Sequence, residues 1–180
     1  MDVEIRAASE SDLASLLQVY DEAAAWLQSI GITEQWAPSF SDNSDLVETC
    51  RGLIGEGKMF VARLQGEIVG SFMLEAFPHG ESHDAVWPDR GEHAMNLYVL
   101  AVRRSVAGRG VALQMLDWAA EHARKAGKRE LRLDFWAGNK RLGRYYAEAG
   151  FESRGHVESA DQFEGKARTY SVSRFARVIA

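Results

Sequence analysis

Apolar residues follow two patterns in the N-terminal part of the chain, one typical of a strand and one typical of a helix. Residues 3–7 alternate between apolar and polar side chains, which predicts a half-buried strand. Ser9 and Asp12 then resemble a capping box with the shorter acid, and apolar residues follow at spacings of three and four until Gly31. Those apolar positions are Leu13, Leu16, Leu17, Tyr20, Ala24 and Leu27. We therefore expect a strand and a long helix, followed by a second helix from Asp45.

A hairpin is the next predicted unit. Two apolar runs, residues 58–64 and 67–76, flank a two-residue connection that ends in Gly66, which can adopt a positive φ. We expect residues 77–91, which hold two prolines and two histidines, to form one long loop. Trp87 in that loop is a candidate for lining an acceptor pocket.

Strands and helices alternate in the second half. The run 94–102 is apolar enough for a central strand, and Asn139 caps a short helix that Gly150 ends. The remaining expected elements are a helix over residues 111–126 and strands over 131–137, 151–157 and 167–174. The order β-α-α-β-β-β-α-β-α-β-β is α/β with a mixed sheet, because the hairpins force some antiparallel pairing.

Composition and charge narrow the class of protein. A chain of 180 residues that is 46% hydrophobic and 26% charged suits one domain, residues 1–180. A formal net charge of −5 argues against a nucleic-acid partner. No apolar run approaches the roughly 18–20 residues of a membrane helix, and the acidic N-terminus does not resemble a secretory signal. With Cys50 as its single cysteine, we expect a cytoplasmic protein without disulfides.

The turn before residue 111 has the chemistry of a phosphate cradle. A strand, a glycine-rich turn and a helix start point backbone N–H groups at one spot, where the helix dipole adds about half a positive charge. Gly108 and Gly110 have no Cβ, so a ligand can approach the main chain closely. Cationic side chains surround the same turn: Arg103, Arg104 and Arg109. Taken alone, the turn equally fits a tight connection with solvated arginines, and it is neither a P-loop nor a dinucleotide fingerprint.

A second segment combines an amide with a tyrosine. Asn139 stands at a helix start, where its side chain can cap the helix or hydrogen-bond a ligand. Tyr146 follows seven residues later, which is two helical turns, so it lies near the same face. Taken alone, Tyr146 is more typical of a residue packed in the core than of a catalytic residue.

Together the two segments resemble the GNAT superfamily of acyl-CoA-dependent N-acyltransferases. The family's cofactor signature, Gln/Arg-x-x-Gly-x-Gly/Ala, falls on residues 107–112, where Gly110 and Ala112 match. Ala107 departs from the pattern, because Gln or Arg is usual there. The later pattern Asn-x₆-Tyr-x₃-Gly-Phe is met by Asn139, Tyr146, Gly150 and Phe151. The resemblance is strong over residues 94–151 and looser elsewhere.

This resemblance implies a fold and a co-substrate. The fold is a central mixed sheet of about six to seven strands flanked by about four helices, in which two parallel strands splay apart to hold acetyl-CoA. The main-chain amide of Leu100 would hold the thioester oxygen as negative charge develops. The implied cofactor contacts are Leu100, Ala101, Val102, Ala107, Gly108, Arg109, Gly110, Val111, Ala112, Asn139 and Tyr146.

The catalytic residues implied by the resemblance are Tyr146 and Asn96. Tyr146 is the expected proton donor to the leaving sulfur, because a phenol with a pKa near 10 keeps its proton at neutral pH. Several relatives have a basic Glu at the position of Asn96. An amide cannot accept a proton there, so we expect Asn96 to position a water or the acceptor. Four other residues are candidates for the general base, although a structural role is favoured for each: Glu34, Glu92, His93 and Asp134.

The expected function is transfer of an acetyl group from acetyl-CoA to a primary amine of a small molecule or peptide by direct attack. Two alternatives remain: an acyl-CoA-binding sensor or interaction module without turnover, and a nucleotide- or phosphate-binding protein of another α/β class. His79, His83 and Asp84 lack a third firm ligand, so no metal site is expected. Arginines that alternate with apolar residues in the last strand indicate an exposed edge and a route to a homodimer: Arg168, Arg174 and Arg177.

Overall fold

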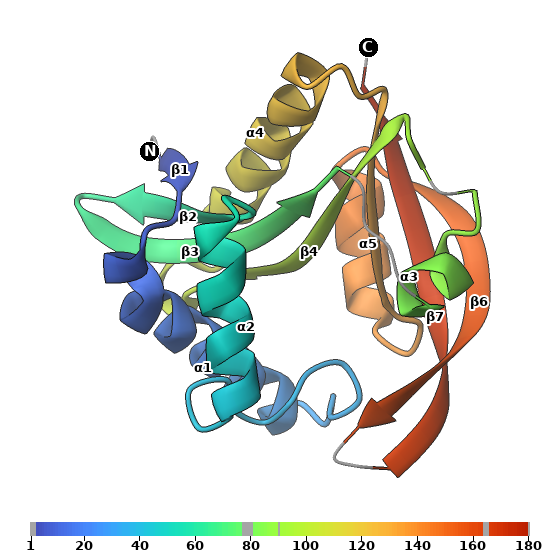
Figure 1. The fold of residues 1–180 in the computed structure, drawn as a ribbon, viewed down its shortest axis with the longest axis horizontal. Coiled ribbons are helices and arrows are strands. Elements are labelled where there is room, and N and C mark those ends of the chain that lie inside the picture. Colours follow the sequence, from blue (N-terminus) through green and yellow to red (C-terminus); the bar gives the residue numbers. More distant parts are fainter. Residues whose placement is uncertain (1–2, 77–80, 90, 164–165, 180) are drawn as a thin grey trace. The chain divides into compact units, whose positions relative to one another are not determined.

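Seven strands form one mixed sheet in the order β1-β2-β3-β4-β5-β7-β6. The structure is a computed structural model that describes residues 3–76, 81–89, 91–163 and 166–179 (Figure 1). Contacts within the chain gather into two compact units, one formed by residues 1–74 and 97–118 and the other by residues 75–96 and 119–180. The α/β class with a mixed sheet is confirmed.

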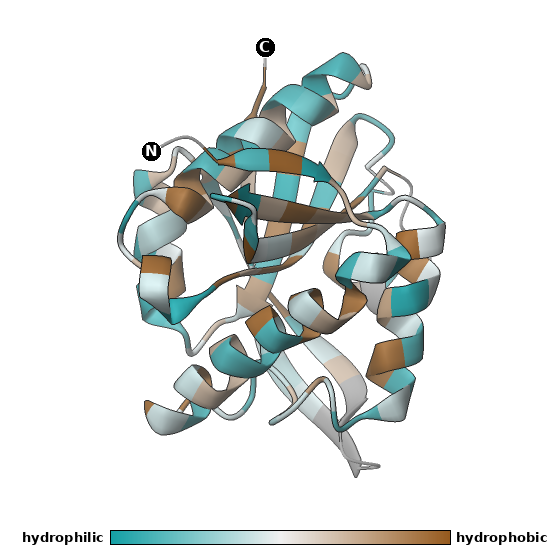
Figure 2. Cartoon of the chain, turned by 90° about the vertical axis from the view of Figure 1, so that its left-hand side faces the viewer, coloured by the Kyte–Doolittle hydropathy of each residue, from teal (hydrophilic) through white to brown (hydrophobic). Residues whose placement is uncertain are grey.

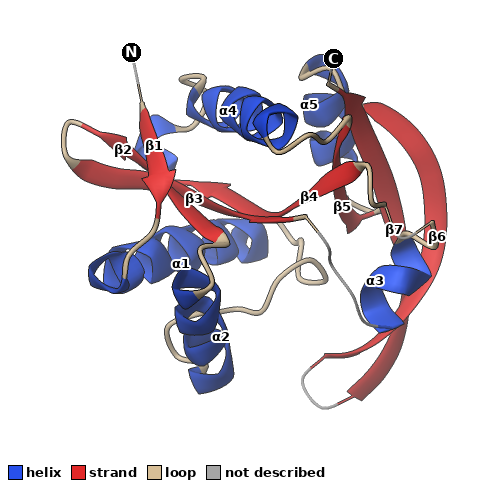
Figure 3. Ribbon diagram, turned by 45° about the horizontal axis from the view of Figure 1, so that its top comes forward, coloured by secondary structure: helices blue, strands red, loops and turns tan. Residues whose placement is uncertain are grey.

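The first unit holds β1 (Glu4–Ala7), α1 (Leu13–Ser29), α2 (Ser44–Gly55), β2 (Met59–Leu64) and nearly all of β3 (Glu67–Glu75). It also holds the C-terminal part of β4 (Ala94–Val102) and the N-terminal part of α4 (Val111–Lys125). Helices α1 and α2 cover one face of β1–β3 and α4 covers the other (Figure 3). The helices carry hydrophobic and hydrophilic segments side by side, as amphipathic elements do (Figure 2).

The predicted turn chemistry of the first unit is confirmed. Gln65 (φ 53°) and Gly66 (φ 88°) both adopt positive φ between β2 and β3, which is the geometry of a tight hairpin turn. Before α1, the Ser9 N–H donates to Asp12 Oδ2 at 2.8 Å, as in a capping box. Arg6 donates to both carboxylate oxygens of Asp12, at 2.7 and 2.9 Å, and holds the pKa of that carboxyl far below its usual range.

The core of the first unit is built on Tyr20. Its buried hydroxyl donates to Ser71 Oγ at 3.1 Å, and Ser71 donates in turn to the Phe60 carbonyl at 2.9 Å. The Tyr20 ring stacks on Phe40 at a centroid distance of 4.9 Å and meets the edge of Trp36 at 5.8 Å. A buried phenol therefore keeps a hydrogen-bond partner while its ring contributes to the apolar core.

The second unit holds the N-terminal part of β4, the C-terminal part of α4 and five complete elements. These are α3 (Glu81–Val86), β5 (Glu130–Trp136), α5 (Lys140–Glu148), β6 (Glu152–Phe163) and β7 (Lys166–Val178). β4 and β5 are parallel, and their register runs over three pairs, from Ala94 with Glu130 to Asn96 with Arg132. β7 pairs antiparallel with both β5 and β6.

Two expectations for the second unit are wrong. Residues 77–91 do not form one loop, because Glu81–Val86 form the helix α3, which is too short to show a hydrophobic period in the sequence. The last strand is not an exposed edge, because β7 lies between β5 and β6. The apolar residues Val172, Phe175 and Ala176 of β7 are buried. The arginines that alternate with apolar residues made the strand resemble an exposed edge.

Gly70 on β3 permits the close approach of α4 in the first unit. A Cβ at this position would lie 2.8 Å from Met115 Sδ and 3.1 Å from the Ala101 carbonyl oxygen. Gly52 in α2 is different, because a Cβ there would meet nothing within 4 Å. The same kind of substitution should therefore have opposite effects at the two glycines.

We expect Gly70→Val to lower the free energy of unfolding by about 1–3 kcal/mol, because overpacking displaces Met115. Gly52→Ala should raise it by about 0.5–1 kcal/mol, since Ala restricts the unfolded chain and favours the helix. Urea unfolding followed by circular dichroism measures both changes. Equal stability of Gly70→Val and wild type would show that α4 does not need this contact.

Candidate functional site

The glycine turn before α4 presents main-chain N–H groups in the first unit. A short 3₁₀ turn, Arg104–Val106, leads into Gly108 (φ 74°) and Gly110 (φ 80°), and a Cβ at either glycine would meet nothing within 4 Å. The Gln114 N–H donates to the Gly110 carbonyl at 3.1 Å. The three N–H groups before Gln114 therefore have no acceptor inside the helix. An anion can bind there, at the positive end of the helix dipole.

The main-chain N–H of Ala107 already has a partner within the first unit. Its N–H donates to the Arg104 carbonyl at 3.2 Å, within the 3₁₀ turn. The first main-chain donors available to a ligand therefore come after Ala107, at the glycines and the helix start.

The three arginines near this turn have different partners. Arg103 donates to the Ile68 carbonyl at 2.9 Å and forms an ion pair with Glu22, so it is engaged within the first unit. The Arg104 guanidinium lies 4.3 Å from the centre of the Trp26 ring, and Arg109 is exposed. Arg104 and Arg109 therefore remain at the surface beside the turn.

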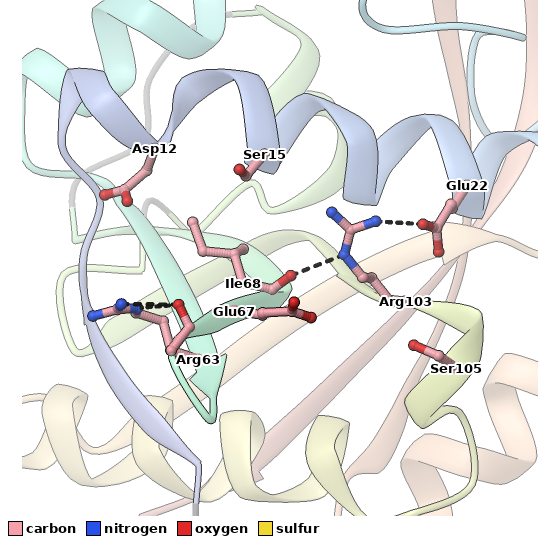
Figure 4. Close-up of a pocket in the computed structure, with 9 residues that line it drawn as sticks. Asp12, Ser15, Glu22, Arg63, Glu67, Ile68, Arg103 and Ser105 are labelled. Atoms are coloured by element: carbon pink, nitrogen blue, oxygen red, sulfur yellow. Dashed lines mark hydrogen bonds and ion pairs between the residues drawn. The ribbon is translucent and has the colours of Figure 1, made fainter.

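A polar groove of about 540 Å³ lies elsewhere in the first unit (Figure 4). It is lined by α1, the β2–β3 hairpin and residues that follow β4: Asp12, Ser15, Glu22, Arg63, Gly66, Glu67, Ile68, Arg103 and Ser105. Arg63 donates to the Gly66 carbonyl at 2.9 Å within it. Arg103, one of the three arginines near the glycine turn, lines this groove, whereas none of the predicted cofactor contacts or catalytic residues does.

β4 contains a backbone irregularity that the sequence did not reveal. Val99 has a φ of 47°, a left-handed conformation that is rare for a β-branched residue. Leu100 and Val102, which follow it, are half-buried, and Ala101 is buried. The distortion turns the main chain directly before Leu100, whose amide is the predicted oxyanion donor.

Asn96 lies on β4 within the second unit and is only 1% exposed. Its Nδ2 donates to the Glu75 carbonyl at 3.5 Å. Its Oδ1 has no hydrogen-bond partner among the described residues. A buried acceptor without a donor is costly, so this oxygen is suited to receive an N–H or O–H from a bound molecule.

The helix α5 places Asn139 and Tyr146 in the second unit. Asn139 Oδ1 accepts the Leu142 N–H at 3.2 Å, so the side chain caps α5. At the other end Gly150 has a φ of 85°, and the Phe151 N–H donates to the Tyr146 carbonyl at 2.9 Å. The family pattern therefore describes a capped helix as well as a candidate site.

Tyr146 is buried against other aromatic rings. Its ring centre lies 5.6 Å from Phe135 and 5.8 Å from Phe151. Burial raises the pKa of the Tyr146 phenol, and the negative charge of the Asp134 carboxylate adds to this effect. The phenol therefore stays protonated throughout the physiological range, as a proton donor must.

Trp87 and Asp134 form a contact that the sequence did not predict. Trp87 is 4% exposed, and its Nε1 donates to Asp134 Oδ2 at 3.1 Å. Trp87 is therefore buried, with its indole N–H engaged by Asp134. From the sequence, Asp134 is a candidate base for which a structural role is favoured. The only feature that sets it apart there is its position as an acidic residue on a strand, between the apolar residues Leu133 and Phe135.

The described part of the chain contains no group of three His, Cys, Asp or Glu residues that could hold a metal ion. His79 lies outside the described residues. No helix in residues 3–76, 81–89, 91–163 and 166–179 is long and apolar enough to cross a membrane.

Comparison with known proteins decides the family. The sequence model of the Acetyltransferase (GNAT) family matches residues 17–151. The chain belongs to the GNAT family of acetyltransferases. Over 145 residues this GNAT chain is 30% identical to the uncharacterized N-acetyltransferase YesJ of Bacillus subtilis (strain 168), a match that covers 80% of the chain and 78% of YesJ. The chain is thus an acyltransferase that uses acetyl-CoA as its co-substrate.

Solved structures share the GNAT fold. An N-acetyltransferase of Staphylococcus aureus Mu50 matches with a TM-score of 0.70 at 18% identity, over 100% of both chains. The protein yncA of Salmonella typhimurium, solved with its cofactor acetyl-CoA, matches with a TM-score of 0.68 at 15% identity, over 100% of this chain and 95% of yncA. At these identities the likeness concerns the fold, which agrees with the predicted GNAT architecture.

The Asn139 cap can be separated from a ligand contact. We expect Asn139→Ala to lower the free energy of unfolding by about 1 kcal/mol, as loss of an N-cap does, whereas Asn139→Ser should retain most of the stability. Asn43→Ala, which removes the cap that accepts from Asp45 and Leu46 in α2, is the matched control. Unchanged stability of Asn139→Ala together with weaker acetyl-CoA binding would assign Asn139 to the ligand instead.

Proposed function

We propose that this GNAT protein transfers the acetyl group of acetyl-CoA to a primary amine of a small molecule or peptide, by direct attack of the amine. The observation that carries the proposal is the glycine turn of the first unit, where Gly108 and Gly110 leave room for a ligand beside the first N–H groups of α4. Acetyl-CoA in the related yncA structure supports the same co-substrate. Acetyl-CoA supplies an acetyl group activated as a thioester.

The residues proposed to hold acetyl-CoA follow from the turn and the family pattern. Main-chain N–H groups of the turn and the helix start bind the pyrophosphate, and Arg109 adds a positive charge. The Leu100 amide, next to the distorted Val99, stabilises the thioester oxygen. The proposed set is Leu100, Ala101, Val102, Ala107, Gly108, Arg109, Gly110, Val111, Ala112, Asn139 and Tyr146.

Two side chains have proposed catalytic roles. Tyr146 donates its phenolic proton to the leaving sulfur, which its raised pKa supports because the phenol is protonated at pH 7. Asn96 orients the acceptor or a water through its unsatisfied Oδ1, since an amide cannot serve as the base.

The organisation of the protein is proposed on the same basis. Residues 1–180 act as one catalytic domain, because the family match over residues 17–151 runs through both units. A homodimer through the edge strand β6 and a cytoplasmic location also remain proposals, the second supported by the single cysteine.

The cofactor site is tested by calorimetry with acetyl-CoA at about 0.1 M salt, where phosphate contacts are still measurable. We expect wild type to bind and Gly110→Glu to lose at least tenfold in affinity, about 1.4 kcal/mol, because a carboxylate enters the anion site. Gly57→Glu is the matched control, since Gly57 has a similar φ of 70° and a Cβ there would meet nothing within 4 Å. Equal binding by all three proteins would place the pyrophosphate elsewhere.

The acid is tested by Tyr146→Phe. We expect kcat to fall by about 10²–10⁴-fold and acetyl-CoA affinity to fall much less, because the substitution removes the acidic hydroxyl and leaves the ring of Tyr146 in place. Tyr145→Phe, which alters the neighbouring ring, should retain activity. Unchanged turnover by Tyr146→Phe would remove the acid role. Tight acetyl-CoA binding by wild type without turnover of any amine would favour the sensor alternative.

A further inference from the structure

A row of charged side chains lies on one face of β5 in the second unit. Glu130, Arg132 and Asp134 alternate with apolar residues, so they share a face. Arg132 is buried, donates to both oxygens of Asp89 at 2.7 Å and to Glu130 at 2.6 Å, and its guanidinium lies 4.5 Å from the centre of the Trp87 ring. The positive charge of Arg132 is therefore compensated by two carboxylates other than Asp134.

Asp134 has no cationic partner among the salt bridges of the described residues. Its hydrogen bond comes from the neutral indole of Trp87. Arg174 stands opposite Asp134 on β7, but it donates to the carbonyls of Val86 at 3.2 Å and Arg154 at 2.7 Å. Burial raises the pKa of the Asp134 carboxyl. Arg174 keeps its positive charge, and its buried Nε has no hydrogen-bond partner among the described residues, but it forms no salt bridge with Asp134 there. The Asp134 carboxylate is therefore compensated only in part, and a cation from outside the chain would stabilise it further.

Asn96 adds a second unsatisfied acceptor on the same face. Asn96 and Arg132 are paired in the register of β4 and β5, and paired residues point to the same side of a sheet. Asn96 Oδ1 is buried and has no donor among the described residues. An ammonium group offers a positive charge and three N–H donors, which is what a carboxylate and an orphaned amide oxygen together lack.

We propose that Asp134 and Asn96 Oδ1 bind the acceptor as a cationic primary amine, and that Asp134 is the base that removes a proton from it. The proposal rests on the acetyltransferase function proposed above and specifies its acceptor. Trp87 is a positioning residue that holds Asp134 Oδ2 through its indole N–H. Asp134 thus supplies the proton acceptor that Asn96 cannot.

The proposed step is balanced in protons and bonds. Asp134 takes one proton from the ammonium, which leaves a lone pair on nitrogen. The nitrogen forms a bond to the acetyl carbon, the carbon–sulfur bond breaks, and Tyr146 gives its proton to the sulfur. The remaining excess proton on nitrogen restores the Tyr146 phenol, and the proton on Asp134 passes to solvent.

The ionisable neighbours of Asp134 are consistent with these roles. Arg132 is engaged by Asp89 and Glu130, Arg174 by main-chain carbonyls, and Tyr146 stays protonated. The ring of Tyr146 packs on Phe135, which points to the opposite face of β5 from Asp134. The base and the acid therefore approach β5 from opposite faces.

The test compares Asp134→Asn with wild type on two kinds of acceptor. One is a panel of alkylammonium compounds that includes spermidine, lysine amide and an aminosugar. The other is O-methylhydroxylamine, which is already unprotonated at pH 7. We expect kcat/KM to fall at least 100-fold on the alkylammonium acceptors, in the range of a lost general base, and by less than about tenfold on O-methylhydroxylamine. Asp42→Asn, at an exposed position of the first unit, is the matched control.

Further measurements separate this role from a structural one. Thermal unfolding and acetyl-CoA calorimetry of Asp134→Asn should match wild type, and Asp134→Glu should recover part of the activity. Asn96→Ala should raise KM for the alkylammonium acceptors more than it lowers kcat. It also gives a second reading of the site if Asp134→Asn does not fold.

Three outcomes would overturn the proposal. Equal losses on both acceptor kinds would indicate a structural role for Asp134, and unchanged activity would remove it from the reaction. Wild type that binds acetyl-CoA but acetylates no member of the cationic panel would refute the acceptor class while leaving the co-substrate site intact. Wild type that binds no acetyl-CoA would instead refute the proposed function itself.

Discussion

Burial of the Arg132 guanidinium is the constraint on which the candidate chemistry of the second unit depends. A charged group with 4% exposure is tolerated only when its N–H donors have acceptors of opposite charge. Removing one partner of such a pair typically lowers the stability by about 3–5 kcal/mol. The carboxylates of Asp89 and Glu130 are the acceptors for Arg132. Because Asp89 follows α3, this pairing fixes the segment after α3 on β5 and brings Trp87 over both Arg132 and Asp134. The environment of Asp134 is thus a consequence of satisfying Arg132.

The presence or absence of an oppositely charged partner also explains why Asp134 differs in character from the other charged residues of β5. Every other charge in the row on β5 has an ionic partner, and Glu130 contacts two arginines, Arg132 and Arg154. Asp134 has an indole N–H, which provides direction without positive charge. The pKa of Glu130 is lowered by its arginines, whereas that of Asp134 is raised by burial. Two acids on one strand face therefore acquire opposite character from their surroundings, which is how proteins separate structural from reactive carboxyls.

The family motifs combine structural and chemical demands at the same positions. Asn139 caps α5, Gly150 ends it with a positive φ, and Tyr146 packs on Phe135 and Phe151 while keeping a protonated phenol. In the first unit Gly108 and Gly110 turn the chain into α4 and also leave the helix start accessible. Such positions were predictable because their structural reason is local.

Local signals account for what the sequence determined by itself: the element order, the hairpin turn at Gly66, the capping box of Ser9 and Asp12, the glycine turn, and the family. Each depends on backbone conformations or hydrogen bonds within a few residues. Contacts between distant residues decided the rest. The insertion of β7 between β5 and β6, the left-handed Val99, the engagement of Arg103 by Glu22, and the pairing of Trp87 with Asp134 join residues far apart in the chain or depend on strain. No local pattern encodes such a partner, because burial and charge compensation exist only once the chain has folded.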